Sequence, residues 1–274
     1  MPDGYGNLCL MERDEHIARI TFNRQEKRNA MSAELTAEIR AALRASWDCT
    51  VVTISGGDGP AFCAGADLSA QERNLTDEPK KWTRTYEDFT ETWEQTNYLM
   101  WQHPGVTIAS VNGYCLAGGG SILASCDLAI SSNQATYGIT EMGFGIFPAL
   151  VVPLLSKSMA KKHLAELMFT VERIDAQDAY RMGLVNWVVP HAELKDKTEI
   201  LAQRIATLDP VRVESAKRTL NMLEHMDWTT GARFGGTLGS AGKNITDAAA
   251  NRTAFLAKQG AGLGQGAAAK TGIF

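Results

Sequence analysis

Two glycine-rich segments and one glutamate carry the clearest chemical signal in the sequence. The first segment is GPAFCAGADLSAQ, residues 59–71, and the second is AGGGS, residues 117–121. Small residues let the backbone turn tightly and leave amide hydrogens, such as that of Ala66, pointing outward where a helix starts. Such amides, with the positive end of the helix dipole, stabilise negative charge that develops on an oxygen atom. The carboxylate of Glu141 follows shortly after the second segment and suits proton transfer.

Each of these features also has a purely structural interpretation. An isolated glycine run is more often a tight turn, and a lone Glu141 is more often a solvated residue that stabilises a helix start. Phosphate binding is a further interpretation, but AGGGS lacks the Gly-Lys-Ser/Thr ending of a P-loop and neither segment matches GxGxxG. The combination of two amide-presenting segments with a carboxylate therefore favours chemistry at a carbonyl group over an ATP or dinucleotide site.

Composition narrows the class of protein further. The chain has 274 residues, a formal charge of −4 and intermixed acids and bases, so we expect no nucleic-acid partner. No long uninterrupted apolar window exists, and acids interrupt the first residues, so we expect no membrane span, no secretory signal and a cytoplasmic location. Five cysteines without a CxxC pair and five scattered histidines predict reduced, buried thiols and no metal site.

The hydrophobic pattern predicts a mixed α/β core with largely parallel strands. Residues 7–23 indicate a hairpin, and a helix capped by Ser32 follows, with an apolar face that ends at Trp47. Strand, short helix and strand then alternate, which is typical of a parallel sheet. Strands are expected at 50–56, 105–113, 127–133 and 185–190, with helices at 79–102, 115–126 and 175–183.

From about residue 191 the pattern contains helices only, at 192–208, 210–226 and roughly 228–258. We therefore expect a core at 1–200 and a helical oligomerisation region at 201–274. An apolar stripe too large for so small a region to cover predicts a homo-oligomer. The stripe consists of Ile200, Leu201, Ile205 and Leu208.

Successive segments of the chain resemble the signatures of the crotonase, or enoyl-CoA hydratase/isomerase, superfamily. They occur in the family's order, the resemblance covers roughly residues 7–260, and several together are far more specific than one glycine run. The segments are EKRNAMS at 26–32, AFCAGADL at 61–68, VNGYCLAGGGSILASCDLAI at 111–130, ATYGITEMGFGIFP at 135–148 and RIDAQDAYRMGLVNWVVP at 173–190.

This resemblance implies an α/β fold in which repeated β-β-α turns form a crotonase-like spiral, with a C-terminal helical region that assembles trimers or dimers of trimers. It implies an acyl-CoA thioester substrate, with coenzyme A as part of the substrate, and no metal or permanently bound cofactor. Carried over residue by residue, the oxyanion-hole amides fall on Ala66 and Gly118, and the catalytic carboxylate falls on Glu141. Preorganised amides of this kind lower a barrier by about 3 kcal/mol each.

One position departs from the usual hydratase pattern. Typical hydratases of the family carry another glutamate just after the glycine run, and ungapped alignment of VNGYCLAGGGS puts Ser121 at that position. A serine there resembles the hydroxycinnamoyl-CoA hydratase-lyases, but those enzymes also use a tyrosine in the C-terminal region, and this chain has none after Tyr180. Because a serine is not a carboxylate base, we expect Ser121 to orient water or substrate by a hydrogen bond.

Weaker signals concern the rest of the substrate. Lys27 and Arg28 lie where coenzyme A phosphates and adenine pass in this family, although they fit solvated basic residues before a helix equally well. Ala30, Ala64 and Asp67 are further expected coenzyme A contacts. The next expected helix has an aromatic face, for which core packing is the default, but this helix often lines the acyl pocket in the family, so we expect a bulky or cyclic acyl group. The aromatic residues are Trp82, Tyr86, Phe89 and Trp93.

We therefore expect an acyl-CoA lyase of the enoyl-CoA hydratase type, acting on a non-standard enoyl-CoA thioester with Glu141 as acid and base. Three alternatives stay open. A double-bond isomerase needs only one carboxylate, and a hydratase-lyase with retro-aldol cleavage would use the same groups. The missing glutamate favours the third alternative, a non-catalytic acyl-CoA-binding protein.

Overall fold

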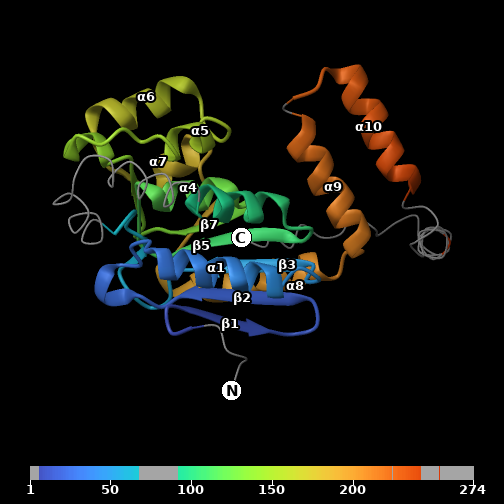
Figure 1. Ribbon diagram of the computed structural model, residues 1–274, viewed down its shortest axis with the longest axis horizontal. Helices are drawn as coiled ribbons and strands as arrows, with labels where there is room; N and C mark the ends of the chain where they lie inside the picture. Colours follow the sequence, from blue (N-terminus) through green and yellow to red (C-terminus); the bar gives the residue numbers. More distant parts are fainter. Residues whose placement is uncertain (1–5, 68–91, 224, 242–252, 254–274) are drawn as a thin grey trace, which may run out of the picture.

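The computed structural model describes residues 6–67, 92–223, 225–241 and 253, and among them the larger sheet has six strands. The first strand pairs antiparallel with the second, and all later pairs are parallel. Branched apolar residues dominate its central strands, as expected for strands buried on both faces. In sheet order the strands are β1 (Cys9–Arg13), β2 (Ile17–Phe22), β3 (Val51–Ser55), β5 (Val106–Val111), β7 (Leu128–Ser132) and β10 (Trp187–Val189) (Figure 1).

A smaller sheet of short strands lies beside the larger one, and within the described residues it has four strands. The chain leaves each of β3, β5 and β7 and adds a strand to this sheet before it turns into a helix or loop. The chain thus forms the expected spiral of β-β-α turns. The strands are β4 (Ala61–Cys63), β6 (Tyr114–Leu116), β8 (Thr136–Gly138) and β9 (Ile174–Asp175).

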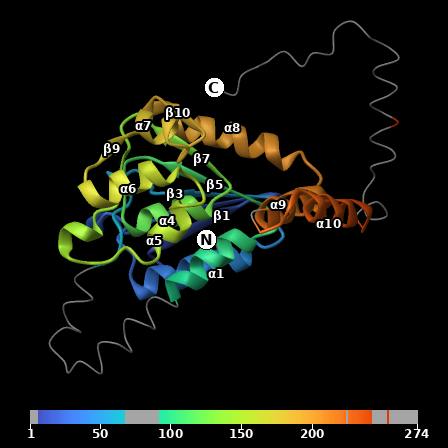
Figure 2. The same ribbon diagram turned by 90° about the horizontal axis from the view of Figure 1, so that it is seen from above.

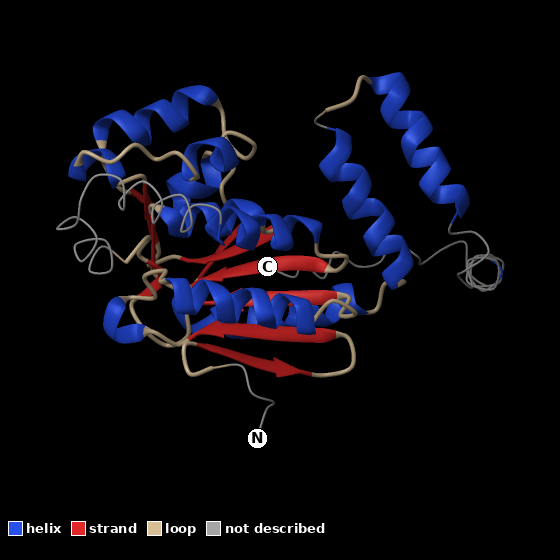
Figure 3. Cartoon of the chain, in the orientation of Figure 1, coloured by secondary structure: helices blue, strands red, loops and turns tan. Residues whose placement is uncertain are grey.

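Helices cover both faces of the larger sheet, whose strands are red in Figure 3. Figure 2 shows α8 (Leu194–Ala206) on one side and α1 (Ala33–Ala45) and α4 (Gly118–Ser125) on the other. The cap prediction for α1 is confirmed, because the Ser32 side chain accepts a hydrogen bond from the Leu35 amide. The predicted position of Trp47 on this helix is wrong: α1 ends at Ala45, and the Trp47 side chain is exposed.

The other predicted elements lie largely where the pattern placed them, but residues 115–116 of the helix expected at 115–126 belong to a strand, and that helix begins at Gly118. Of the helix expected at 228–258, residues 228–241 are helical, and all but residue 253 of the remainder lies outside the described part. Of the helix expected at 79–102, residues 92–102 are helical and residues 79–91 lie outside the described part. The prediction of buried thiols is confirmed for four of the five free cysteines, and Cys126 is partly exposed. The helices not yet named are α5 (Val151–Leu155), α6 (Lys161–Thr170), α7 (Ala176–Arg181), α9 (Pro210–Leu223) and α10 (Trp228–Ala241), of which α5 and α6 were not predicted.

Helix α8 packs against the larger sheet. Leu194, Leu201 and Ala202 lie in a buried cluster with apolar side chains of five sheet strands. The predicted boundary near residue 200 falls inside this helix, whereas the α9–α10 hairpin begins at Pro210. Of the predicted apolar stripe, Leu201 is buried against the sheet, and Ile200 and Leu208 are about half exposed.

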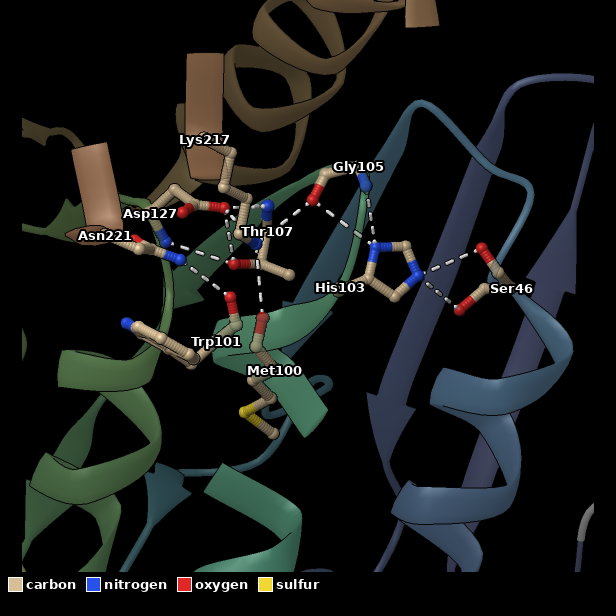
Figure 4. Close-up of polar contacts among 9 residues, drawn as sticks. All are labelled: Ser46, Met100, Trp101, His103, Gly105, Thr107, Asp127, Lys217 and Asn221. Carbon is tan, nitrogen blue, oxygen red and sulfur yellow. Dashed lines mark hydrogen bonds and ion pairs between the residues drawn. The ribbon is translucent and has the colours of Figure 1, made fainter. Parts of the chain in front are cut away.

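A buried lysine docks α9 against the core. The Lys217 ammonium lies 2.7 Å from a carboxylate oxygen of Asp127 and donates to the carbonyls of Met100 and Gly105, both at 3.1 Å (Figure 4). Asn221, one turn further along α9, donates to the Trp101 carbonyl at 2.9 Å. The hairpin is therefore held at the C-terminal end of the helix at 92–102 and at the start of β5.

A neutral histidine completes this polar cluster. The His103 ring is buried, and its Nδ1 accepts from the Gly105 amide at 3.0 Å while Nε2 lies 3.0 Å from the Ser46 carbonyl (Figure 4). One ring nitrogen accepts and the other donates, which is the hydrogen-bond pattern of neutral imidazole. Burial, assisted by the nearby Lys217 charge, lowers the pKa of His103 to about 4.

Candidate active site

Three parallel strands of the smaller sheet lead to the three residues expected to carry the chemistry. Ala66 follows β4 by three residues, Gly118 follows β6 by two, and Glu141 follows β8 by three. Strands β6 and β8 pair in register, with Leu116 opposite Gly138, and β4 pairs with β6 across a one-residue register shift that sets Cys63 opposite Cys115. Because the carboxyl ends of adjacent parallel strands meet at one edge of a sheet, the fold brings two glycine-rich turns and a carboxylate to the same edge.

The two glycine-rich turns are in direct contact. Gly65 has a φ of +100°, and a Cβ there would lie 2.8 Å from the Ala117 Cβ and 3.5 Å from the Gly118 nitrogen. A Cβ on Gly119 would lie only 2.4 Å from the Cys63 carbonyl oxygen. Glycine is therefore required on both sides of this contact, since any side chain would separate the turns.

Ala117 adopts a backbone conformation that alanine rarely takes. Its φ is +50° and its ψ is −123°, directly before the first residue of α4. Such conformations cost about 1–3 kcal/mol and persist only where the surroundings impose them. The Ala117 amide donates to the Gly138 carbonyl at 2.9 Å, which ties the turn to the neighbouring strand β8.

Neighbouring amides in both turns donate hydrogen bonds, whereas those of Ala66 and Gly118 have no acceptor within the described residues. Gly65 donates to the Cys63 sulfur and Asp67 to the Met31 carbonyl, whereas no hydrogen bond among the described residues uses the Ala66 or Gly118 amide. Gly118 is the first residue of α4, where an amide has no partner within the helix. Both residues are partly exposed, so an oxygen of a ligand could accept from them.

Glu141 begins a short 3-10 helix, η2 (Glu141–Phe144), at the end of β8. Its Oε2 is buried and has no hydrogen-bond partner within the described part of the chain. Burial raises the pKa of Glu141, and hydrogen bonds from the Glu141 and Thr140 backbones offset part of this effect. A carboxyl group whose two protonation states are closer in energy near neutral pH suits both donation and acceptance of a proton.

Ser121 is fully buried within α4. Its hydroxyl donates to the Gly118 carbonyl at 2.7 Å and accepts from the Trp93 indole N–H at 2.7 Å. Trp93 lies in the helix at 92–102 and is itself buried in the core. The other residues of the predicted acyl pocket, Trp82, Tyr86 and Phe89, lie outside the described residues.

The expected coenzyme A contacts lie in and beside η1 (Gln25–Lys27) and the first glycine-rich turn. Lys27 and Arg28 are exposed, and the Arg28 guanidinium lies 6.0 Å from the centre of the Tyr114 ring. Arg173 lies 5.6 Å from the same ring centre. The Ala64 amide donates to the Arg28 carbonyl at 3.1 Å, so the basic segment and the glycine-rich turn are joined.

Asp67 is buried and forms an ion pair with Arg24, with an N–O distance of 2.6 Å. Arg24 also donates to the Ala30 carbonyl at 2.7 Å, so it joins two of the expected coenzyme A contacts. Asn29, fully buried, donates to carbonyls on both sides of the turn into β4, including that of Ala61 at 2.9 Å. Sequence reasoning missed Arg24 and Asn29, since their partners are distant in the chain.

Two kinds of site are absent from the described part of the chain. No cluster of three or more His, Cys, Asp or Glu side chains among them is placed to hold a metal ion. None of the described helices is long and apolar enough to cross a membrane.

A two-sheet spiral with a carboxylate and two glycine-rich turns at one edge defines a protein of the crotonase fold. The chain belongs to the enoyl-CoA hydratase/isomerase family, since the family model of that description matches residues 12–260. Enzymes of this family act on coenzyme A thioesters and keep no permanently bound cofactor.

Individual relatives are similar over most of their length. Hydroxycinnamoyl-CoA hydratase-lyase of Pseudomonas fluorescens is 33% identical over 229 residues, which are 82% of each chain. (E)-Benzylidenesuccinyl-CoA hydratase of Thauera aromatica is 30% identical over 212 residues, covering 76% of this chain and 80% of the relative. The crystal structure of human enoyl Coenzyme A hydratase domain-containing protein 3 superposes with a TM-score of 0.84 at 28% identity, covering 92% of this chain and 98% of that one.

Proposed function

We propose that this chain is an acyl-CoA lyase of the hydratase type that adds water to a bulky enoyl-CoA thioester. The amides of Ala66 and Gly118 bind the thioester oxygen, and Glu141 moves the proton. One observation carries the proposal: three parallel strands end at one edge with two amides that no described residue occupies and with the partly buried Glu141 carboxylate, whose pKa is raised.

A single carboxylate suffices to balance the reaction. Glu141 takes a proton from water as the hydroxyl group adds to the β-carbon, and the electron pair of the double bond moves to the thioester oxygen. The two amides stabilise the charge on that oxygen, which is larger in the transition state than in the ground state. The protonated Glu141 then delivers its proton to the α-carbon, and the carboxylate is restored.

The proposed acyl group is bulky or aromatic. Two relatives are named for aromatic acyl groups, hydroxycinnamoyl and benzylidenesuccinyl. Directly after Glu141 the chain exposes three large apolar side chains, those of Met142, Phe144 and Phe147. Apolar groups so close to the carboxylate favour an apolar acyl chain over a small polar one.

The proposal for the rest of the substrate uses exposed basic groups. Lys27 and Arg28 would contact the coenzyme A phosphates, since both are exposed and the Arg28 carbonyl is hydrogen-bonded to the turn that precedes Ala66. The backbones of Ala30 and Ala64 would border the adenine.

A homotrimer, alone or as a dimer of trimers, is also part of the proposal. The α9–α10 hairpin exposes the apolar side chains of Leu220, Leu223 and Trp228, the last being 86% exposed. Exposed apolar groups gathered in one hairpin are typical of a surface that another subunit covers. Light scattering at micromolar concentration should therefore give a trimer or hexamer, and a monomer would contradict this part of the proposal.

The second candidate function is a double-bond isomerase. Among the described residues that follow these strands, Asp67 is paired with Arg24, whereas Glu141 has a carboxylate oxygen without a hydrogen-bond partner. Moving a double bond requires only that one such base remove and return a proton. Mass spectrometry of the products from straight-chain, cyclic and aromatic enoyl-CoA thioesters separates the candidates. A product heavier by one water supports the hydratase, unchanged mass with altered retention supports the isomerase, and two fragments support retro-aldol cleavage. Tight binding without turnover would support a binding protein.

Replacement of Glu141 tests the mechanism itself. Glu141→Gln should keep its affinity for the thioester, because the amides are unchanged, and lose about a hundredfold or more in turnover, the usual scale for a general acid or base. The matched control is Glu12→Gln, which removes an exposed carboxylate on β1. Wild-type turnover by Glu141→Gln on the best substrate would refute the mechanism.

A further inference from the structure

A short chain of hydrogen bonds links the core to the second glycine-rich turn. The Trp93 indole N–H donates to the Ser121 hydroxyl, and the Ser121 hydroxyl donates to the Gly118 carbonyl, both at 2.7 Å. Both side chains are almost completely shielded from solvent, with 3% of Trp93 and 0% of Ser121 exposed. The chain of bonds therefore ends on the residue that is expected to bind the thioester oxygen.

The direction of these bonds is determined by chemistry. An indole N–H can only donate, so the Ser121 oxygen must accept from Trp93. A hydroxyl has one proton, and the Ser121 proton is directed at the Gly118 carbonyl. Its only donor is thus already committed to the protein, and turning it toward water or substrate would break the bond to Gly118.

The Trp93 ring also packs directly on Gly118. A Cβ on Gly118 would lie 2.4 Å and 2.6 Å from two carbon atoms of the indole ring. Gly118 is therefore held at its Cα by the ring and at its carbonyl by Ser121. The preceding Ala117 has the strained ψ of −123° that sets the direction of the Gly118 amide. A strained turn of this kind needs rigid neighbours on its far side.

We propose that Trp93 and Ser121 form a positioning pair that aims the Gly118 amide at the thioester oxygen. This inference rests on the proposed function, because it explains how one of the two amides keeps its direction. Neither side chain contacts the substrate. Ser121, at the position where typical hydratases carry a glutamate, thus acts through Gly118.

A matched pair of serines in α4 tests the proposal. Ser125 is also buried, one turn further on, and its hydroxyl contacts the same neighbouring helix through Asn97 at 3.1 Å. Ser121→Ala should lower kcat about tenfold, the effect of one misaligned hydrogen bond, with KM changed less than about twofold. Ser125→Ala should leave both constants within about twofold of wild type. Equal kcat values for the two variants would overturn the proposal.

The carbonyl stretching frequency of a bound thioester reports the amide directly. Cinnamoyl-CoA labelled with ¹³C at the thioester carbonyl, bound to Glu141→Gln to prevent turnover, should absorb at lower frequency than in water. Adding Ser121→Ala should return the band toward its position in water, and adding Ser125→Ala should not. A low-frequency band that Ser121→Ala leaves unmoved would overturn the positioning pair alone. No frequency shift even with Ser121 intact would overturn the proposed oxyanion hole, and the pair with it.

A double-mutant cycle tests whether the pair acts as a unit. Trp93→Phe removes the indole N–H and part of the ring on Gly118, and it should lower kcat at least as much as Ser121→Ala does. If Ser121 acts through Gly118 together with the indole, the kcat of the double variant should lie within about twofold of the kcat of Trp93→Phe. Fully multiplicative losses would refute joint action. Should Trp93→Phe fail to fold by circular dichroism, the two serine variants still decide the proposal.

Discussion

Replacement of Lys217 by methionine should destabilise the protein by about 3 kcal/mol. The substitution keeps the length of the apolar stem but removes the 2.7 Å ion pair with Asp127 and the donors to the Met100 and Gly105 carbonyls. Loss of one partner of a buried ion pair costs about 3–5 kcal/mol. The lower end applies, because Asp127 is 24% exposed and keeps two hydrogen bonds from Thr107, at 2.7 and 2.9 Å.

Urea unfolding at a single protein concentration measures this loss, since assembly into the proposed trimer would make stability depend on concentration. Lys195→Met, an exposed lysine on α8, is the control and should change stability by less than about 0.5 kcal/mol. The double variant Lys217→Met with Asp127→Asn should recover part of the loss, because the unpaired charge is removed. A loss under about 1 kcal/mol for Lys217→Met, or a double variant less stable than the single one, would refute this reasoning.

Three further predictions concern pH and glycine packing. The pKa of His103 is about 4 in the fold against an ordinary 6.5, so the unfolded chain binds a proton first as the pH falls. The free energy of unfolding should therefore fall by about 3 kcal/mol from pH 6.5 to 4. Urea titrations of His103→Gln should show a smaller dependence on pH. Gly118→Ala should lower the free energy of unfolding by about 1–3 kcal/mol and abolish most turnover, since its Cβ would overlap the Trp93 ring. The control Gly120→Ala, whose Cβ would have its nearest contact at 3.5 Å, should be at least as thermally stable as wild type. Burial raises the pKa of Glu141, so the fold favours the protonated carboxyl group and loses stability as the pH rises. Glu141→Gln should therefore be more stable than wild type at pH 8 and equally stable at pH 4. A calorimetric difference that does not change with pH would contradict this.

The sequence predicts those parts of the fold that depend on local patterns. Strands β3 (VVTIS) and β5 (VTIASV) are short segments rich in Val, Ile and Thr, and Ser32 is a strong cap signal before an amphipathic helix. The strands β4, β6 and β8 have three residues each, too few for a two-residue period to be recognised. The hydrophobic pattern therefore does not predict the sheet edge at which the site residues lie. The family resemblance indicates those residues instead.

The supporting contacts of the site depend on distances that no local pattern contains. Ser121 meets Trp93 across 28 residues of sequence, and Arg24 meets Asp67 across 43. From the sequence, the hydroxyl group of a serine after a glycine run could donate a hydrogen bond either to substrate or to a carbonyl of its own helix. Only the packing of the helix at 92–102 against α4 distinguishes these roles, and that packing is a tertiary property.

The helix at 92–102 contacts α4 near Trp93 and α9 near Trp101. Its first described turn carries Trp93, whose ring packs on Gly118, and the carbonyls of its last turn accept from Lys217 and Asn221 of α9. About 12 Å of rigid helix separates Trp93 from Trp101 at the usual rise per residue. A force that a neighbouring subunit exerts on α9 would thus travel along this rod to Gly118. In the proposed trimer, subunit association and thioester affinity would then share one coupling free energy. The factor by which assembly raises ligand affinity would equal the factor by which the ligand raises the affinity between subunits.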